Sequence, residues 1–191
     1  MNEELRSRWD ERYRESGGGH DPAAVLGQYA HLLPATGMAL DLACGLGANA
    51  LLLASRGLRT WAWDISPVAV ERLKAAARRA GATIQAEVRD VVTQPPHPGS
   101  FDVIVVSRFL ERSLSASLQA ALRPGGLLFY QTFTRSRVTD SGPRNNAYRL
   151  EDNELLSLFG GLKLRAYREE ALLGDTRQGF RNEALMVAQK V

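Results

Sequence analysis

Residues 39–49 read Ala39-Leu40-Asp41-Leu42-Ala43-Cys44-Gly45-Leu46-Gly47-Ala48-Asn49, and this stretch decides the predicted fold. It predicts a buried strand over 38–42 that ends in an acid, a turn on two glycines, and a helix over 48–56. Small residues let the backbone approach a ligand at the carboxyl end of a parallel strand, where open α/β sheets bind cofactors. The turn alone does not identify the ligand, because glycine-rich turns also serve dinucleotides and phosphates.

Size and composition are those of one globular domain, 1–191. Hydrophobic residues make up 45% of the chain and charged residues 24%, which is ordinary for a soluble protein. The net charge is only +3 with the basic residues dispersed, so no clear nucleic-acid partner is expected. The first fifteen residues are too charged for a secretory signal, and no apolar run approaches a membrane span. We expect a cytoplasmic protein without a membrane partner, as a monomer or a weak homodimer.

Metal and thiol chemistry are not expected. The single cysteine, Cys44, excludes an intramolecular disulfide and a multi-cysteine metal site. The histidines His20, His31 and His97 lack the i+3 or i+4 partners of helical metal sites. His20 and His31 remain candidates for a general base, although a structural role is favoured for such isolated histidines.

The amino-terminal segment 1–33 predicts a helical cap within the domain. Leu5, Trp9 and Tyr13 are spaced by four and share one face of a helix over 2–15. Glycines 17–19 then provide a hinge, and a second short helix is expected over 23–33. The pattern leaves two possibilities open, a mobile lid and a helix packed permanently on the sheet edge.

Alternating strands and helices follow. This order predicts a doubly wound, mostly parallel sheet of seven strands with helices on both faces and a C-terminal antiparallel hairpin, a Rossmann-like α/β fold. Between its fifth strand and the next helix, the polar run 134–147 predicts a long functional loop. The expected strands are 38–42, 58–63, 83–88, 101–106, 127–133, 162–169 and 183–189, and the expected helices are 48–56, 67–80, 110–122 and 150–159.

Three acids stand at the carboxyl ends of successive predicted strands: Asp41, Asp64 and Asp90. An acid about 20 residues beyond a glycine turn is placed to accept hydrogen bonds from ribose hydroxyls, in nicotinamide cofactors as in others. Asp41 precedes the turn, where it can bind the turn's own amides or a ligand ammonium group. Asp90 can accept from an exocyclic amine such as that of adenine. The structural alternative for Asp64 and Asp90 is capping of the helices that follow.

Four motifs, in order, resemble those of class I S-adenosylmethionine-dependent methyltransferases. They are Asp41–Gly47, the acid of Trp63-Asp64-Ile65-Ser66, the run Arg89-Asp90-Val91, and Leu122-Arg123-Pro124-Gly125-Gly126. The resemblance covers roughly residues 36 to 133. Together the motifs are specific, although none is so alone. Ala43 departs from the family pattern, which most often has glycine there, and its extra methyl group is expected to be tolerated.

The resemblance implies S-adenosylmethionine as the cofactor. Residues 43–47 would face its methionine part with Ser107 beneath, Asp64 would bind both ribose hydroxyls, and Ile65, Asp90 and Val91 would surround the adenine. Cys44 is expected to act there as a small turn residue, since nothing near it in sequence activates a thiolate. The full predicted cofactor set is Trp9, Asp41, Ala43, Cys44, Gly45, Gly47, Asn49, Asp64, Ile65, Ser66, Asp90, Val91 and Ser107.

A narrower resemblance links the chain to the tellurite-resistance and thiol-methylating branch of small-molecule enzymes. It rests on residues 8–13 (Arg-Trp-Asp-Glu-Arg-Tyr), on 47–49 and on the strand ending Trp61-Ala62-Trp63-Asp64. In that branch the amino-terminal segment closes over the cofactor. Trp9 and Tyr13 would then shield the sulfonium, whose positive charge is attracted to aromatic faces.

The methyl acceptor is expected to be a small molecule, with a soft nucleophile such as a thiol or a selenium or tellurium oxyanion as one possibility. A soft nucleophile needs no strong base at neutral pH. Tentative acceptor residues are Tyr13, Phe109, Arg112, Arg144 and Asn146. Arg112, Arg144, Asn146 and Tyr148 would form an anion-binding wall, or the two arginines would instead make salt bridges that hold a loop. No catalytic residue is predicted.

Other functions remain open. A nicotinamide-dependent oxidoreductase would need a third glycine at the turn and a catalytic couple such as Tyr-x-x-x-Lys, and neither is present. An RNA or protein methyltransferase is compatible with a pI of about 9.3, but the basic residues do not cluster with aromatics. A binding module that holds the cofactor without chemistry is compatible with the sequence as well.

Overall fold

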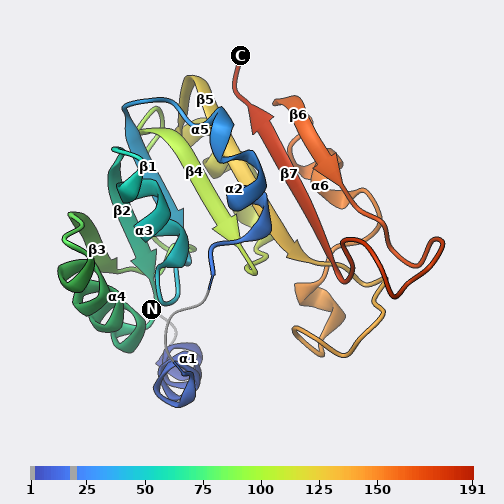
Figure 1. The fold of residues 1–191 in the computed structure, drawn as a ribbon, viewed down its shortest axis with the longest axis horizontal. Coiled ribbons are helices and arrows are strands. Elements are labelled where there is room, and N and C mark those ends of the chain that lie inside the picture. Colours follow the sequence, from blue (N-terminus) through green and yellow to red (C-terminus); the bar gives the residue numbers. More distant parts are fainter. Residues whose placement is uncertain (1–2, 18–20) are drawn as a thin grey trace.

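Seven strands form one mixed sheet in the computed structural model, which describes residues 3–17 and 21–191 (Figure 1). The strand order is β3-β2-β1-β4-β5-β7-β6. The first five strands are parallel, and β7 is antiparallel to β5 and β6. The predicted doubly wound sheet with a C-terminal antiparallel pair is therefore confirmed. The strands are β1 (Met38–Leu42), β2 (Arg59–Asp64), β3 (Ile84–Val88), β4 (Phe101–Ser107), β5 (Leu122–Phe133), β6 (Lys163–Arg168) and β7 (Glu183–Gln189).

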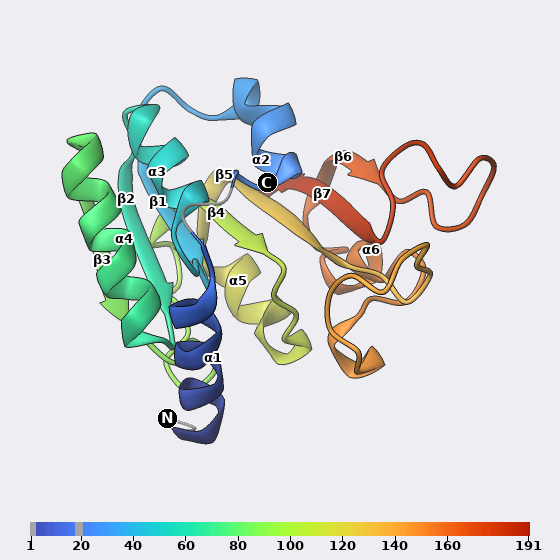
Figure 2. The ribbon, with the colours of Figure 1, turned by 60° about the horizontal axis from the view of Figure 1, so that its bottom comes forward.

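Helices cover both faces of this sheet (Figures 1 and 2). On one face, α2 packs on β5 and β7 while α3 and α4 pack on β1 to β3; α5 lies on the other face. The α-helices are α1 (Glu3–Glu15), α2 (Ala24–Tyr29), α3 (Ala48–Ser55), α4 (Pro67–Ala80), α5 (Ser115–Ala121) and α6 (Glu154–Leu158). Short 3-10 helices are η1 (Ala30–Leu32), η2 (Arg112–Leu114) and η3 (Asn146–Tyr148). Within the described residues, no helix has the length and apolar character needed to cross a membrane.

Local sequence explains the central elements. The apolar run of β4 is buried on both faces, as expected for an inner strand of a parallel sheet. Ser66 caps α4, since its hydroxyl accepts from the amide of Ala69 at 3.1 Å, and Pro67 occupies the first helical position. Gly81 ends the same helix with a left-handed φ of 63°.

Three predicted elements differ from the structure. The helix expected over 110–122 is α5 preceded by η2, because the side chain of Glu111 accepts from the amide of Ser113 and starts a 3-10 turn instead. The helix expected over 150–159 is only α6. The amide of Leu150 donates to Phe133 O at 2.8 Å, which continues the sheet, and Asn153 adopts a left-handed φ of 61°.

The strand expected over 127–133 is longer in the structure, since β5 also includes the motif residues 122–126. Leu122 already pairs with Phe101, so the strand begins with the motif. The glycines are accommodated by a register shift between Phe101 and Val103 and by a φ of 79° at Gly125. A bulge of this kind keeps the strand continuous while re-aiming its residues.

Candidate active site

The three strand-end acids meet at one edge of the sheet. The arrowheads of β1, β2 and β4 point to the same edge, and α1 lies beyond it (Figure 1). Asp41, Asp64 and Asp90 are all buried, at 0%, 4% and 8% exposure. Burying three carboxylates close together is costly unless hydrogen bonds compensate, so their partners indicate what each acid does.

Asp41 anchors the start of α3. Its Oδ2 accepts from the amide of Ala50 at 3.0 Å, and its Oδ1 accepts from Asn49 Nδ2 at 3.3 Å. The same Asn49 nitrogen donates to Ser107 Oγ at 3.0 Å, and Asn49 Oδ1 accepts from the amide of Ala23 at 2.9 Å. Of the two roles open to Asp41, the structure shows the first, binding of backbone amides. Asn49 joins β1, β4 and the segment that leads into α2.

The glycine turn uses left-handed backbone at three positions. Ala43, Gly45 and Gly47 have φ angles of 54°, 52° and 80°. The glycine that the family favours at position 43 is explained, because L-residues other than glycine adopt this region at a cost of about 1 kcal/mol. A Cβ at Gly47 would clash with the side chain of Leu73, so this glycine lets the turn pack on α4. A Cβ at Gly45 would lie 2.9 Å from Tyr13 Oη, so this glycine opens toward α1.

Asp64 ties the turn to the next strand. Its Oδ2 accepts from the amide of Gly45 at 2.8 Å, and its Oδ1 accepts from the amide of Ser66 at 2.9 Å. Asp90 uses Oδ1 to accept from the amides of Val92 and Thr93, at 3.1 and 3.4 Å. The capping alternative therefore holds in part for Asp64, whereas Asp90 accepts from the amides of a turn and no helix follows it before β4. A carboxylate oxygen has two lone pairs, so each acid keeps acceptor capacity for a ligand.

Helix α1 covers the glycine turn. The ring of Tyr13 lies against Gly45, and the Trp9 and Tyr13 rings are stacked with centroids 5.6 Å apart. Leu5, Trp9 and Tyr13 are all half-buried, as the spacing of four predicts. Of the predicted hinge, Gly17 is described, whereas Gly18, Gly19 and His20 lie outside the described residues.

Two side chains, Asp10 and Arg72, make the polar contacts that fasten α1 to α4, beside which it lies in Figure 2. At the amino end of α4, Asp10 accepts a short hydrogen bond from Ser66 Oγ. On the next turns, the guanidinium of Arg72 donates to the carbonyl oxygens of Tyr13, Ser16 and Gly17. Arg72 thus caps the last turn of α1, where carbonyls have no helical partner. Ser66 touches both Asp10 and Asp64, so it links the covering helix to the strand-end acid.

Burial raises the pKa values of the titratable side chains at this edge of the sheet. It raises the pKa of Asp41 to about 8, against hydrogen bonds from Asn49 and Ala50 that lower it. Burial likewise raises the pKa of Asp64 to about 6. The pKa of the Tyr13 hydroxyl is raised by burial and then by the nearby Asp64 carboxylate. Burial also raises the pKa of the Cys44 thiol well above its usual value, so Cys44 is an unreactive small residue of the turn.

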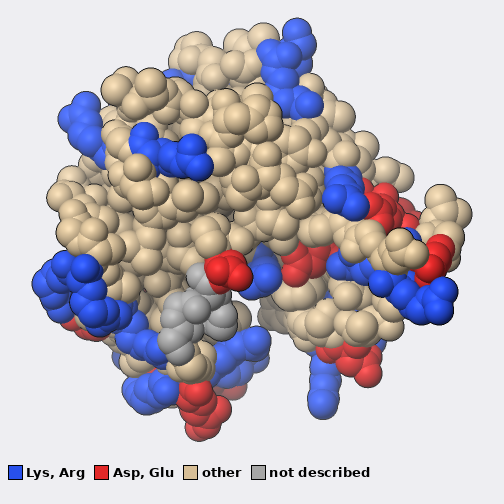
Figure 3. Space-filling model, in the orientation of Figure 1, with Lys and Arg blue, Asp and Glu red and all other residues tan. Residues whose placement is uncertain are grey.

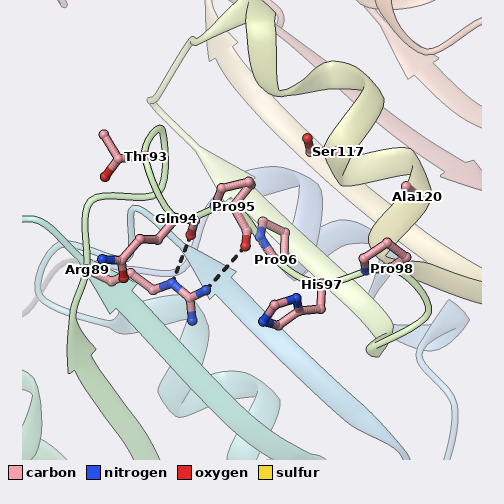
Figure 4. A pocket seen from close by; sticks show the side chains of 9 residues that line it. All are labelled: Arg89, Thr93, Gln94, Pro95, Pro96, His97, Pro98, Ser117 and Ala120. Atoms are coloured by element: carbon pink, nitrogen blue, oxygen red, sulfur yellow. Dashed lines mark hydrogen bonds between the residues drawn. The ribbon is translucent and has the colours of Figure 1, made fainter.

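The side of the site near Asp90 is formed by the proline-rich loop 94–98 between β3 and β4. The guanidinium of Arg89 stacks on the Trp63 ring, 3.8 Å from its centroid, and donates to the carbonyls of Gln94 and Pro95 (Figure 4). A surface pocket of about 520 Å³ lies beside this loop and also contacts α5. Val91 is buried in the core cluster with Trp63. Arg89 therefore holds the backbone that presents Asp90 and Val91.

The predicted acceptor residues are distributed unevenly. Phe109 packs partly into the core, and its carbonyl accepts from Tyr130 Oη at 2.9 Å. The guanidinium of Arg112 is occupied, because it binds both carboxylate oxygens of Glu154 and the carbonyls of Ala147 and Arg149. For Arg112 the geometry thus favours the loop-fixing salt bridge. The side chains of Arg144, Asn146 and Tyr148 are exposed on the loop.

Arg149 organises the loop of residues 134–149. It is completely buried and donates to the carbonyls of Pro143 at 2.7 Å and of Thr134 at 2.8 Å, with a further short bond to that of Ser141. Its guanidinium lies 5.6 Å from the centre of the Phe133 ring. Sequence reasoning missed this residue, since nothing local distinguishes it from the other arginines of the loop, 135, 137 and 144.

A hollow opens at this edge of the molecule. Figure 3 shows it between the region of α1 and the region of the 134–149 loop, with charged side chains of both signs at its margin. His31 lies in η1, before the amino end of β1, and His97 lines the pocket beside the proline-rich loop. Neither described histidine is at this edge.

Comparisons with known proteins agree with this geometry. Residues 39–126 match the family model of a methyltransferase domain. TehB from Haemophilus influenzae is similar over 97% of this chain and 67% of that chain, with 20% identity and a TM-score of 0.71. Geranyl diphosphate C-methyltransferase from Streptomyces coelicolor A3(2), solved with Mg²⁺, geranyl diphosphate and S-adenosyl-L-homocysteine, is 14% identical over 97% and 98% of the two chains, with a TM-score of 0.70.

A third similar structure comes from work on the conversion of a disulfide bond into a thioacetal group during echinomycin biosynthesis. It is 21% identical over 97% of this chain and 92% of that one, with a TM-score of 0.70. At these identities the solved structures establish the fold, and the family match establishes the domain. Residues 39–126 thus match a methyltransferase domain, and the whole chain has the fold of S-adenosylmethionine-dependent methyltransferases. The cofactor that this match implies is S-adenosylmethionine.

The residues present fit that cofactor. Gly45 lets the backbone of the turn come close to Tyr13, because a Cβ there would crowd the Tyr13 hydroxyl, and Asp64 and Asp90 present carboxylates at the ends of adjacent strands. Sequence reasoning did not find Asp10, Ser66 Oγ and Arg72 as the fastening of α1. Asp10 follows Trp9 directly, which is the only local signal for it; Arg72 has none.

Proposed function

We propose that this enzyme transfers the methyl group of S-adenosylmethionine to a small acceptor that presents a soft nucleophile, a thiol or a selenium or tellurium oxyanion. The observation that carries the proposal is the cover over the cofactor turn. With Tyr13 against Gly45, the entry left at this edge is the hollow between α1 and the 134–149 loop (Figure 3). A hollow of this kind suits a small molecule.

The cofactor residues follow from the same geometry. We assign the methionine part to residues 43–47, with Asp41, Asn49 and Ser107 supporting them. Asp64 would bind the ribose hydroxyls, Ile65 and Val91 would pack against the adenine, and Asp90 would accept from its amine. Ser66 supports Asp64 through its amide, while Trp9 and Tyr13 would lie on the sulfonium side.

The chemistry asks little of acid–base groups. Bound S-adenosylmethionine supplies a methyl group on a positively charged sulfur. The protein's part is to align the acceptor and to exclude water, which accelerates a displacement in which charge is lost. The aromatic pair Trp9 and Tyr13 would provide the water exclusion. A thiolate or oxyanion acceptor would not require a general base, in keeping with the positions of His31 and His97.

Two of the similar proteins are compatible with a soft acceptor. One is TehB, and the other belongs to work on a disulfide-to-thioacetal conversion. The third methylates carbon, as its name states. The fold therefore does not choose the acceptor, and the choice rests on the site.

An acceptor panel tests the proposal. The purified protein would be incubated with S-adenosylmethionine and each of several thiols, selenite, tellurite, small alcohols and amines, and an RNA pool, with S-adenosylhomocysteine measured by mass spectrometry. We expect turnover with the soft acceptors. Turnover confined to alcohols, amines or RNA would contradict the proposal, and salt-sensitive retention of RNA on the protein would favour an RNA methyltransferase.

A further inference from the structure

Arg108 holds an unusual backbone conformation at the active-site edge. It directly follows Ser107, the last residue of β4, and has a φ of 53°, the left-handed region that disfavours residues with a Cβ. Its amide donates to Gln131 O at 2.8 Å, which fixes this geometry. A non-glycine residue kept in such a conformation beside an active site suggests a functional constraint on its side chain.

The side chain of Arg108 is held at one end and free at the other. Its Nε lies 3.4 Å from Glu183 Oε1, and Glu183 is itself held by a short hydrogen bond from Gln131 Nε2. Neither Nη atom of Arg108 has a partner among the described residues. The Arg108 side chain is 55% exposed, whereas that of Glu183 is 12% exposed. Two donors of a guanidinium fork therefore face solvent.

Arg108 lies in the part of the site where we place the methyl acceptor. Strand β4 lies between β1, whose turn is covered by α1, and β5, which leads into the 134–149 loop. The residue after β4 therefore lies between the turn that follows β1 and the loop that follows β5. Ser107, one residue earlier, accepts from Asn49 of the cofactor turn at 3.0 Å. Arg108 is thus next in the chain to the last of the residues assigned to the cofactor site, Ser107.

Two other arginines near this edge offer no comparable fork. Arg112 and Arg149 spend their guanidinium groups on carbonyls and on Glu154. A planar guanidinium with two open donors matches the spacing of a carboxylate or another oxyanion.

We propose that the Nη groups of Arg108 bind an oxyanion group of the methyl acceptor, so that the enzyme prefers anionic over neutral acceptors. The inference rests on the proposed function, and it names the class of the acceptor: a soft nucleophile that carries, or is part of, an oxyanion. Glu183 opposes this preference, because its carboxylate competes for the same guanidinium. Removing the Glu183 charge should therefore strengthen anion binding.

A matched pair of thiols tests the inference. The probes are 3-mercaptopropionate and its neutral amide, 3-mercaptopropanamide, and the quantity compared is the ratio of their kcat/KM values. For Arg108→Gly we expect this ratio to fall about tenfold, the scale of one charge-assisted hydrogen bond, mainly through KM for the acid. For Arg108→Lys the fall should be smaller, and for Glu183→Gln the ratio should rise.

The variants separate specificity from folding. Glycine adopts a φ of 53° without strain, so Arg108→Gly should have a Tm no lower than the parent chain. Arg165→Gln, on the distant strand β6 where the arginine binds Gln189, serves as the arginine control and should leave the ratio unchanged. A ratio unaltered in Arg108→Gly would overturn the inference.

A binding measurement distinguishes this inference from the proposed function. Calorimetry on the protein loaded with S-adenosylhomocysteine would compare both probes and selenite for the parent chain and for Arg108→Gly. If no thiol is methylated but the acid still binds in an Arg108-dependent manner, the soft-acceptor proposal fails and the anion site stands. If neither the acid nor selenite binds more tightly to the parent chain than to Arg108→Gly, the anion site is refuted. Binding of selenite alone would assign the fork to an inorganic oxyanion.

Discussion

The carboxylate of Asp64 holds the backbone of Gly45 directly, through a hydrogen bond of 2.8 Å from the glycine amide to Oδ2. The acid at the end of β2 is thereby tied to the turn at the end of β1, 19 residues earlier. Position and shape of the cofactor turn thus depend on the residue that we assign to the ribose.

Asp64→Asn should weaken binding of S-adenosylmethionine and S-adenosylhomocysteine about 10- to 100-fold, because it removes a charged acceptor from both ligand and turn. Calorimetry would measure this, with NAD as a third ligand. Glu71→Gln, an exposed acid of α4 paired with Lys74, is the control and should bind normally. Binding of NAD in place of the other two would refute the cofactor assignment.

Arg72→Ala should release α1 from α4, because the Arg72 guanidinium binds the carbonyl of Tyr13 in the last turn of α1 and those of Ser16 and Gly17, which follow the helix. We expect dissociation of S-adenosylhomocysteine about tenfold faster, on the scale of a lost charge-assisted hydrogen bond. Stopped-flow displacement would measure it. Arg78→Ala, exposed on the same helix, should dissociate at the parent rate; equal rates for both variants would mean that α1 does not retain the ligand.

Asp41 should make the ligand-free protein less stable as the pH rises. Burial raises its pKa from 3.8 to about 8 in the folded chain, so between these values the folded state binds more protons than the unfolded state. The free energy of unfolding therefore falls with increasing pH over this window. Urea unfolding from pH 5 to pH 8.5 would show a shallower fall for Asp41→Asn. Parallel curves for the two proteins would contradict the assignment of the proton to Asp41.

Arg112 and Arg144 should differ in what they stabilise. Arg112→Gln breaks a paired carboxylate and two carbonyl contacts, so we expect a loss of about 1–2 kcal/mol in the free energy of unfolding, allowing for partial exposure. The exposed Arg144 has no such contacts among the described residues, and Arg144→Gln should change stability by less than about 0.5 kcal/mol. If Arg112→Gln instead lost anion binding without losing stability, Arg112 would belong to the anion-binding wall of the acceptor site.

Local chemistry made much of the fold predictable. The apolar run of β4, the caps Ser66 and Gly81 of α4, and the alternation of strands and helices each follow from neighbours in sequence, and the structure contains all of them. The predicted helices over 110–122 and 150–159 were too long for a different reason. Glu111 and Leu150 make contacts that compete with helix formation, and for Leu150 the partner lies on β5, 17 residues earlier.

The sequence by itself determined the class of sheet, the glycine turn and the acids that end the strands, because strand order and turn chemistry depend on short-range pattern. Only the tertiary structure decided which guanidinium groups bind acceptors within the protein and which have open donors. Arg149 and Arg112 are consumed by carbonyls of a folded loop, Arg72 caps a helix 55–59 positions away, and Arg108 keeps two open donors. A guanidinium looks the same in any sequence, and its role depends on which acceptors the folded chain brings within about 3 Å of it.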